Sequence, residues 1–186
     1  MSNLRLDAFS KADAEKIWRL AYSTQEPEWS KSNAPYFEEY QAYASLDDFI
    51  NSNDWSFLQG EQRRCIRVDN EPLGMVSRYW VDRKTRWMEV GIAIYDEHKW
   101  GFGYGSQALA LWTSACFEEY PELEHLGLST WSGNSRMLAL AESIGYQKEA
   151  EIRAVRFWQG VYYDSIKYGV LRGEWEKLGY LKQEAK

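Results

Sequence analysis

The chain is poor in the residues from which metal sites and disulfide frameworks are built. It contains two cysteines and two histidines in 186 residues. Cys65 and Cys116 lie far apart in the sequence, as do His98 and His125, so neither pair has the short spacing of zinc ligands. Two thiols also form no disulfide scaffold, and both are expected to be buried and reduced. The sequence therefore predicts no metal cofactor.

Long apolar runs are missing as well. No stretch of about 18 consecutive apolar residues occurs, and the N-terminus lacks a basic segment followed by an apolar one. Neither a membrane span nor a signal peptide is expected. A cytoplasmic location without a membrane partner follows as the expectation.

Basic residues are in deficit. The chain has 22 Lys and Arg against 28 Asp and Glu, a net charge of −6. Nucleic-acid binding depends on neutralising phosphates with Lys and Arg, so no nucleic-acid partner is expected. The negative charge is compatible with a cationic small substrate.

The most informative segment that is present is rich in glycine. A predicted strand from Glu89 and a short turn lead to Trp100-Gly101-Phe102-Gly103-Tyr104-Gly105, where a helix is expected to begin. Glycine lets a ligand approach the backbone amides, and a helix N-terminus adds partial positive charge. Together these features predict a site for phosphate or pyrophosphate.

Two other glycine motifs fit this segment poorly. A P-loop ends in Gly-Lys-Ser/Thr, whereas this loop ends in Gly105-Ser106-Gln107. A dinucleotide-binding fingerprint needs G-x-G-x-x-G near the first strand, whereas this loop lies in mid-chain with Ser at position 106. Alternating glycines are a weak signal by themselves, because they can serve only to form a turn. The rest of the chain therefore has to be considered.

One continuous domain over residues 1–186 is expected. Strands are predicted at 4–9, 63–69, 73–81, 87–95, 126–131, 151–158 and 161–171, and helices at about 10–21, 103–120, from 45 onward and from 134 to 144. Residues 22–44 are expected to be irregular, and Asn70-Glu71-Pro72 to form a turn. The order β-α-α-β-β-β-α-β-α-β-β predicts an α+β fold with a mixed, mostly antiparallel sheet flanked by helices.

This order and three motifs resemble the GNAT superfamily of acyl-CoA-dependent N-acyltransferases, in particular its RimJ/RimL-like branch. The family's pyrophosphate loop, R/Q-x-x-G-x-G/A, corresponds to residues 100–105, with Trp100 replacing the leading Arg or Gln. Asn134, followed twelve residues later by Gly145-Tyr146, matches the next helix, and Tyr163–Trp175 resembles the closing strand. The resemblance covers nearly the whole chain.

The resemblance implies an N-acetyltransferase that moves an acetyl group from acetyl-CoA to a primary amine by direct attack in a ternary complex. The acceptor would be a protein N-terminal amine, a polyamine or another small amine, and the chain a monomer or homodimer. The pantetheine arm would lie along Ile92, Ala93 and Ile94. The remaining cofactor-binding candidates are Trp100, Gly101, Phe102, Gly103, Tyr104, Gly105, Ser106 and Asn134. For Asn134, a plain helix N-cap is an equal alternative.

Two positions depart from the family pattern. Many GNAT enzymes carry, seven residues after the Asn, a Tyr that protonates the leaving thiolate; here it is Ala141. The RimJ/RimL branch often has Ser three residues after the Asn, and here it is Met137. The general acid is therefore unassigned, and a non-catalytic acyl-CoA-binding module on the same fold stays an alternative.

The acceptor is expected beside residues 22–50, where acids and aromatic rings would both attract a cation. The acids are Glu26, Glu28, Glu38, Glu39, Asp47 and Asp48, against Lys31 alone. Trp29, Tyr36 and Tyr40 are the substrate-binding candidates. The alternative is a solvated acidic loop.

Glu89 is the candidate general base. It stands two residues before Gly91, where a bulge is expected to free a backbone donor for the thioester carbonyl. It also stands eleven residues before Trp100, where several GNAT enzymes carry a Glu. Partial burial would raise its pKa toward neutrality. The alternative is a Glu that orders a neighbouring loop or binds the cationic acceptor without proton transfer.

Overall fold

The computed structural model describes residues 3–37 and 40–181. Residue contacts group the chain into two compact units. Unit 1 comprises Met1–Ser77 and Ile92–Ala108, and unit 2 comprises Arg78–Gly91 and Leu109–Lys186. The single domain expected from the sequence stays a prediction.

In the part of the chain that the structure describes, seven strands form one sheet in the order β1-β2-β3-β4-β5-β7-β6. They are β1 (Leu4–Asp7), β2 (Arg63–Val68), β3 (Glu71–Asp82), β4 (Trp87–Ile94), β5 (His125–Trp131), β6 (Gln147–Trp158) and β7 (Val161–Leu171). β4 and β5 pair in parallel, whereas β1–β2, β2–β3, β5–β7 and β6–β7 are antiparallel. The expected α+β class with a mixed, mostly antiparallel sheet is confirmed.

Among the described residues, six α-helices and three helical turns of other types accompany the sheet. The helices are α1 (Ala14–Ile17), α2 (Leu46–Ile50), α3 (Asn53–Leu58), α4 (Tyr104–Glu119), α5 (Ser135–Ser143) and α6 (Arg172–Lys177). The turns are η1 (Lys11–Asp13), η2 (Trp18–Tyr22) and η3 (Glu97–Lys99). In the described part of the chain, no helix is both long enough and apolar enough to cross a membrane.

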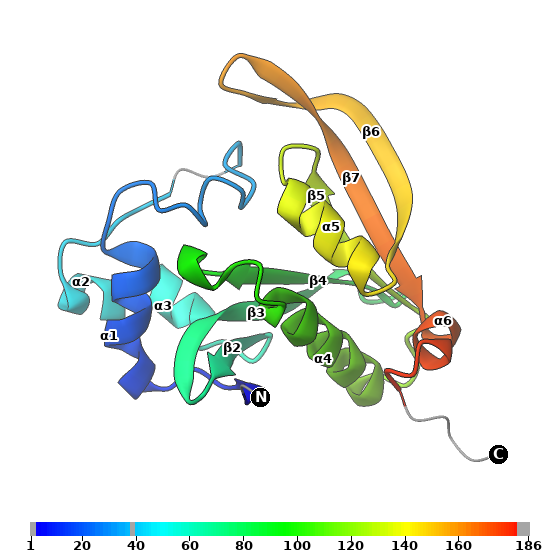
Figure 1. Ribbon diagram of the computed structural model, residues 1–186, viewed down its shortest axis with the longest axis horizontal. Coiled ribbons are helices and arrows are strands. Elements are labelled where there is room, and N and C mark those ends of the chain that lie inside the picture. The colour runs from blue at the N-terminus through cyan, green and yellow to red at the C-terminus, as the bar shows by residue number, and fades with distance from the viewer. Residues whose placement is uncertain (1–2, 38–39, 182–186) are drawn as a thin grey trace. The chain divides into compact units, whose positions relative to one another are not determined.

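Unit 1 has an aromatic core beneath α1, α2 and α3, which lie beside one another (Figure 1). Ile17, Tyr22, Phe49, Trp55 and Cys65 are all buried in this core. Aromatic rings stack and meet edge to face within it, as in the pair Tyr22–Phe49 with centroids 4.9 Å apart. The core thus accounts for much of the unusual aromatic content of the sequence.

The helix expected over residues 10–21 is divided into η1, α1 and the π-helical turn η2. The carbonyl of Ala21, near the end of this segment, accepts hydrogen bonds from Trp29 Nε1 at 3.1 Å and from the Tyr40 hydroxyl at 2.7 Å. In a regular α-helix each residue has the same backbone hydrogen-bond pattern. Side chains that bond to the last carbonyls favour a different pattern there, such as the π-helical turn η2. Both side chains follow the segment in the sequence, in the irregular stretch after it, so the pattern within residues 10–21 could not reveal the division.

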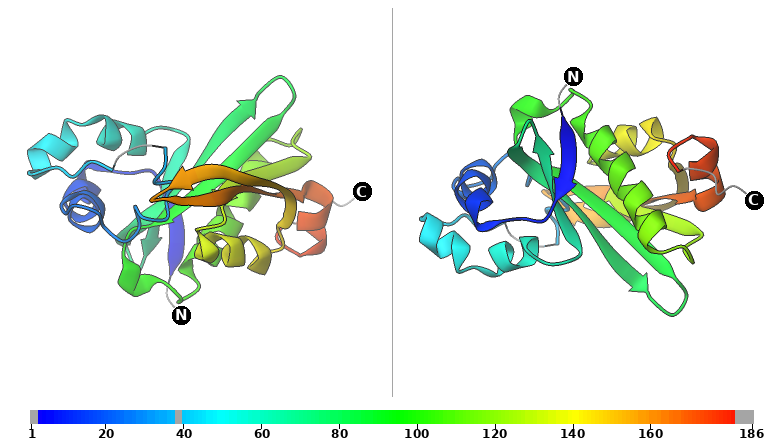
Figure 2. Two further views of the ribbon diagram at one scale, coloured as in Figure 1. Left: turned by 90° about the horizontal axis from the view of Figure 1, so that it is seen from above. Right: turned by 90° about the horizontal axis from the view of Figure 1, so that it is seen from below.

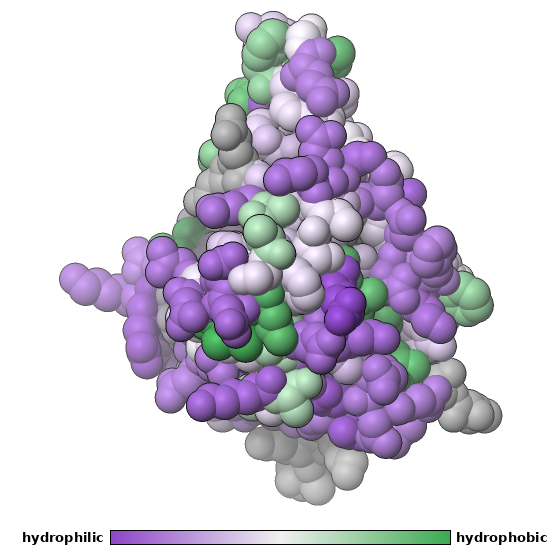
Figure 3. All heavy atoms as spheres, turned by 90° about the vertical axis from the view of Figure 1, so that its left-hand side faces the viewer, coloured by the Kyte–Doolittle hydropathy of each residue, from purple (hydrophilic) through white to green (hydrophobic). Residues whose placement is uncertain are grey.

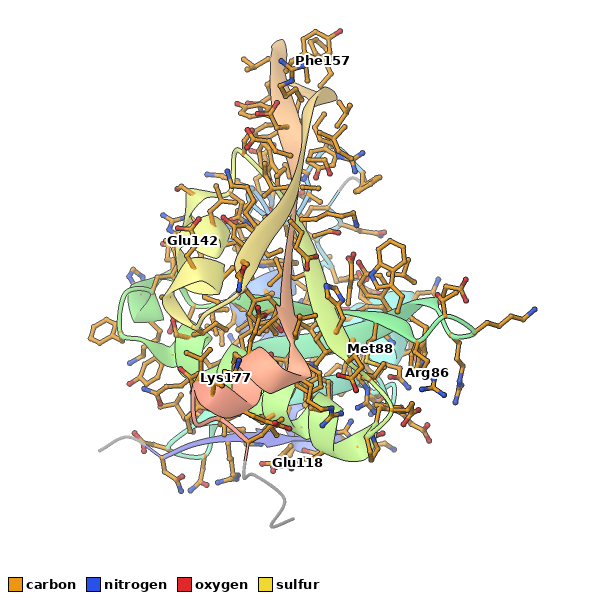
Figure 4. All side chains as sticks on the ribbon, turned by 90° about the vertical axis from the view of Figure 1, so that its right-hand side faces the viewer. Arg86, Met88, Glu118, Glu142, Phe157 and Lys177 are labelled. Atoms are coloured by element: carbon orange, nitrogen blue, oxygen red, sulfur yellow. The ribbon has the colours of Figure 1, made fainter. Side chains whose placement is uncertain are left out.

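Unit 2 contains a twisted hairpin of β6 and β7 that continues past the end of β5 (Figures 1 and 2). β5 pairs with β7 from His125↔Leu171 to Trp131↔Ser165, and the hairpin turns at Gln159-Gly160. Phe157 lies near its tip (Figure 4). The core side of β5 and β7 carries buried Leu126, Leu128, Ile166, Tyr168 and Val170.

Several element boundaries differ from those expected. Helices α3 and α6 were not expected, and β6 begins at Gln147 rather than 151. The turn before β3 is formed by Asp69 and Asn70, both with positive φ, rather than by residues 70–72. Asn and Asp tolerate the left-handed conformation, so this two-residue turn leaves Pro72 free to lie within β3.

Candidate active site

The loop after β4 is fixed to the end of its strand by Trp100. The indole Nε1 of Trp100 donates to the carbonyl of Ile94 at 3.0 Å. The backbone amide of Trp100 donates to the backbone carbonyl of Glu97 at 3.1 Å. Trp100 thus folds the loop back onto β4 within unit 1. This is a structural role that does not require the Arg or Gln of the family motif.

Gly101 and Gly103 form an arch in front of α4 that only glycine adopts without strain. Both have φ of +81°. A Cβ built on Gly101 meets no heavy atom within 4 Å, and one on Gly103 meets only Gln107 Nε2, at 3.9 Å. Open space therefore lies over the backbone at both positions, which fits the approach of a phosphate group.

Helix α4 follows this arch directly. It is 16 residues long, and its first turn, with Tyr104, Gly105 and Ser106, has no acidic side chain. The amides at the start of a helix point along its axis and carry partial positive charge. Phe102 is 65% exposed and stacks on Tyr104 with centroids 6.2 Å apart. The arch and the helix start together form an anion-binding geometry.

Ile92, Ala93 and Ile94 are half-buried at the end of β4. The carbonyl of Ala93 approaches Gly74 of β3 so closely that a Cβ there would lie 2.1 Å from it. Toward β5, the register of β4 comprises only Met88↔Leu126 and Glu89↔Gly127 among the described residues. Pairing with β5 thus ends before Gly91. The bulge expected at Gly91 itself stays a prediction.

Of the three predicted acceptor-binding rings, Trp29 lies in the core of unit 1 and Tyr40 packs against that core. Trp29 is 8% exposed and its indole donates to the carbonyl of Ala21. Tyr40 donates to the same carbonyl and packs edge to face on Trp29, with centroids 5.8 Å apart. Tyr36 is half-buried beside Phe37, 5.0 Å away. Trp29 and Tyr40 thus pack on each other and bond to the same backbone carbonyl, and the acceptor-binding role of the three rings stays a prediction.

The acids of residues 22–50 are mostly at the surface. Glu26, Asp47 and Asp48 are exposed, and Glu28 forms an ion pair with Lys31. Glu38 and Glu39 lie outside the described residues. The outer surface over α1 and α2 is mostly hydrophilic (Figure 3). The acidic character expected of this segment is therefore available to a cation in solution.

Glu89 lies in unit 2 at the centre of a polar network. The residue is 2% exposed. Its Oε2 accepts hydrogen bonds from the hydroxyls of Tyr79 and Ser129, the latter at 2.7 Å. Its Oε1 accepts from Lys167 Nζ at 2.8 Å, and Lys167 also donates to Ser129 Oγ at 2.8 Å. The hydroxyls of Tyr79 and Ser129 and the ammonium of Lys167 thus all donate to the carboxylate.

The pKa of Glu89 is lowered, so the expectation of a raised value is wrong. Burial raises the pKa of this carboxyl, but the hydrogen bonds from Lys167, Tyr79 and Ser129 outweigh it and favour the charged form. The same burial, with the nearby carboxylate, raises the pKa of Tyr79. Glu89 is therefore an anion at neutral pH and Tyr79 a neutral donor.

Sequence reasoning found Glu89 but missed Tyr79, Ser129 and Lys167. Each is a polar residue in a strand, which alone is a weak signal. Ser129 and Lys167 are register partners on β5 and β7. Only this pairing brings them to the same carboxylate.

The second motif is organised around helix α5. Asn134 caps the helix, because its Oδ1 accepts from the amide of Met137 at 3.0 Å. Ala141 is fully buried in unit 2. Neither Met137 nor Ala141 has a titratable group, so this helix contains no proton donor at the two positions that the family uses. Within the described ranges, no group of three His, Cys, Asp or Glu side chains is placed to hold a metal ion.

The chain is similar to known proteins in sequence and in fold. The acetyltransferase (GNAT) domain model matches residues 3–147. The SPbeta prophage-derived uncharacterized N-acetyltransferase YokL of Bacillus subtilis is 28% identical over 157 residues, which cover 75% of this chain and 88% of YokL. The candidate ribosomal N-acetyltransferase YdaF of the same bacterium is 31% identical over 111 residues, or 60% of each chain.

A solved structure shares the fold. The spermidine N-acetyltransferase from Vibrio cholerae, in complex with CoA and spermine, has a TM-score of 0.69 at 20% identity. The likeness covers 93% of this chain and 98% of that one.

Proposed function

Because the chain belongs to the acetyltransferase (GNAT) domain family, we propose that it transfers the acetyl group of acetyl-CoA to a cationic primary amine by direct attack in a ternary complex. Acetyl-CoA is the usual co-substrate of this family. One observation carries the proposal, the arch of Gly101 and Gly103 at the start of α4 with open space above it. In this proposal the pyrophosphate lies on residues 102–106 and the pantetheine arm along residues 92–94, where its amides pair like an added strand.

A polyamine is the acceptor that we propose. The chain has a net charge of −6, and the exposed acids Glu26, Asp47 and Asp48 lie on a mostly hydrophilic surface of unit 1. Such a surface attracts a multiply charged amine. The Vibrio cholerae structure of similar fold contains CoA and spermine. YdaF is named for ribosomal proteins, so a protein amine is the second candidate.

Glu89 is proposed to accept the proton that the amine loses. An ionised carboxylate has about four acceptor positions, and three are occupied by Tyr79, Ser129 and Lys167. One position on Oε1 is left for the amine or a bridging water. The nitrogen that attacks is neutral, because it has first lost its ammonium proton to water. As the nitrogen–carbon bond forms and the carbon–sulfur bond of the thioester breaks, the nitrogen becomes acidic and its second proton passes to Glu89, while CoA leaves as the thiolate. No residue of this chain is assigned as the acid that protonates the thiolate.

Thiol release from acetyl-CoA tests this function directly. The acceptor panel should include spermidine, spermine, short peptides with free N-termini, and neutral and anionic amines. We expect polyamines to give the highest kcat/KM and added salt to lower it, because screening weakens attraction between separated charges. A preference for neutral or anionic amines would contradict the proposed acceptor. Binding of acetyl-CoA without thiol release from any acceptor would contradict catalysis.

A further inference from the structure

A row of polar side chains crosses four neighbouring strands of unit 2. Tyr79 is on β3, Glu89 on β4, Ser129 on β5 and Lys167 on β7, and these strands are adjacent in the sheet. Glu89 lies within the row with its side chain 3% exposed, whereas that of Lys167 is 33% exposed. Lys167 therefore connects a buried carboxylate to the solvent-facing surface.

Lys167 is held in place by contacts besides the ion pair. Its Nζ donates to Ser129 Oγ at 2.8 Å and lies 5.6 Å from the centroid of the Trp87 ring, within range of a cation–π interaction. A long, flexible lysine side chain loses much rotamer freedom when it is fixed in this way. The contacts thus maintain one ammonium position rather than a mobile charge.

The other titratable side chains near Glu89 supply no second cation to its carboxylate among the described residues. A Cβ built on Gly127 would lie 3.2 Å from both Glu89 Cγ and His125 Cε1, so His125 of β5 lies across that glycine. The Nε2 of His125 is 2.9 Å from Glu149 Oε1 of β6. From β3, Tyr79 offers a neutral hydroxyl. Lys167 is thus the cation in direct contact with Glu89 among the described residues.

We propose that Lys167 is a positioning residue that keeps Glu89 ionised during acetyl transfer; this inference rests on the role proposed above for Glu89. A carboxyl removed from water favours its neutral form unless a partner stabilises the charge. A protonated Glu89 would have no capacity to accept the amine proton. Lys167 therefore determines how far into the acid range the enzyme can work.

The matched variants are Lys167→Gln, which keeps an N–H donor without the charge, and Lys167→Arg, which keeps the charge. Lys167→Met is a second neutral variant should Lys167→Gln not fold. Lys148→Gln is the control, because Lys148 lies on the adjacent strand β6 and pairs with exposed Glu151. The titration of Glu89 is followed by NMR of protein labelled at the glutamate carboxyl carbon, with its signal assigned by its loss in Glu89→Gln.

The second readout is the ratio of kcat/KM between variant and wild type from pH 4 to 8.5, a range that includes the titration of Glu89. The acceptor amine titrates equally in both enzymes, so its effect cancels in the ratio. We expect Lys167→Gln to raise the pKa of Glu89 by about one unit or more. The rate ratio should accordingly fall severalfold toward pH 4, where Glu89 is more fully protonated in the variant than in wild type. Lys167→Arg and Lys148→Gln should change neither readout.

The two readouts separate two failures. An unchanged pKa of Glu89 in both neutral variants would overturn the role of Lys167, whatever the rates. A raised pKa with a flat rate ratio would instead overturn the use of Glu89 in catalysis, and with it the function of Lys167 in the reaction.

Discussion

At the scale of single residues, the environment of a carboxylate determines what it can do. Glu89 is buried, and isolation from water alone would make it a neutral acid. Three donors from three other strands reverse this effect and hold it as an anion. An anion of lowered pKa takes a proton only from a group that has itself become acidic, such as nitrogen after attack on the thioester.

Replacing Glu89 by Gln tests this role. The change keeps the shape and most hydrogen-bonding capacity but removes the proton acceptor. We expect kcat to fall by about 10²-fold or more, with calorimetric affinity for acetyl-CoA unchanged. Glu149→Gln is the matched control, because Glu149 is a strand glutamate on β6 whose carboxylate bonds to His125. A Glu89→Gln enzyme of near-normal rate from pH 6 to 9 would remove Glu89 from the reaction.

A second buried carboxylate supports the fold rather than the reaction. Asp13 in η1 receives two hydrogen bonds from Arg67 of β2, at 2.7 and 2.8 Å, and others from Ser10. Burial raises the pKa of Asp13, but these bonds outweigh it, so the pKa is lowered. The pair attaches the first helical segment to the sheet within unit 1.

Asp13→Asn should lower the free energy of unfolding by about 3 kcal/mol, because it leaves the buried Arg67 without its main partner. The Oδ2 of Asp7 lies 3.2 Å from Nε of Arg67, so this carboxylate should reduce the loss in the free energy of unfolding. A group of lowered pKa stabilises the fold above its unfolded pKa and ceases to do so as the pH falls through its folded pKa. The difference in the free energy of unfolding between wild type and Asp13→Asn should thus be constant from pH 5 to 8 and shrink below about pH 3.8. Urea unfolding at several pH values measures this, and a gap that widens with acid would contradict it.

At the scale of elements, the strand, arch and helix of residues 87–119 form the segment with the clearest local sequence signal. Gly101 and Gly103 have a φ that other residues adopt only with strain, so substitutions there disturb both conformation and ligand space. Gly105 is different. It is the second residue of α4 and lies outside the positive-φ region, so a side chain there fits the helical backbone.

Gly105→Val should therefore weaken acetyl-CoA binding by at least tenfold while leaving the thermal midpoint within a few degrees of wild type. A β-branched side chain would block the approach to the first-turn amides without straining φ. Gly173→Val is the matched control, because Gly173 is the second residue of α6 and a Cβ there meets nothing within 4 Å. Calorimetry on both variants gives the test, and equal affinities would place the pyrophosphate elsewhere.

At the scale of the whole molecule, binding of acetyl-CoA should appear as stability. A ligand at about 100 times its Kd adds roughly 2.7 kcal/mol to the native state. For a chain of this length, about 2–4 °C per kcal/mol then gives a rise of roughly 5–10 °C in Tm. Scanning fluorimetry with acetyl-CoA measures the shift, and Gly105→Val should lose most of it. A full shift in that variant would contradict the placement of the cofactor.

The sequence by itself determined the α+β class, most of the strands, the extent of α4 to within a residue at each end, and the β6–β7 turn. These features follow from short-range rules, namely the helical and strand periodicities and the backbone freedom of glycine. It also singled out the glycine segment by its spacing, and Glu89 by its place relative to that segment and by the resemblance to GNAT enzymes. The sequence did not predict the short helices α3 and α6, because a segment of six residues shows too little helical periodicity to be recognised.

Only the tertiary structure decided the charge of Glu89 and the place of the aromatic rings. The donors to Glu89 stand 10, 40 and 78 residues away in the sequence and meet it through strand pairing. Trp29 lies in the core of unit 1 and Tyr40 packs against it, and both bond to the carbonyl of Ala21. A pKa depends on every group around a side chain, and burial depends on every element packed over it, so neither can be obtained from local spacing.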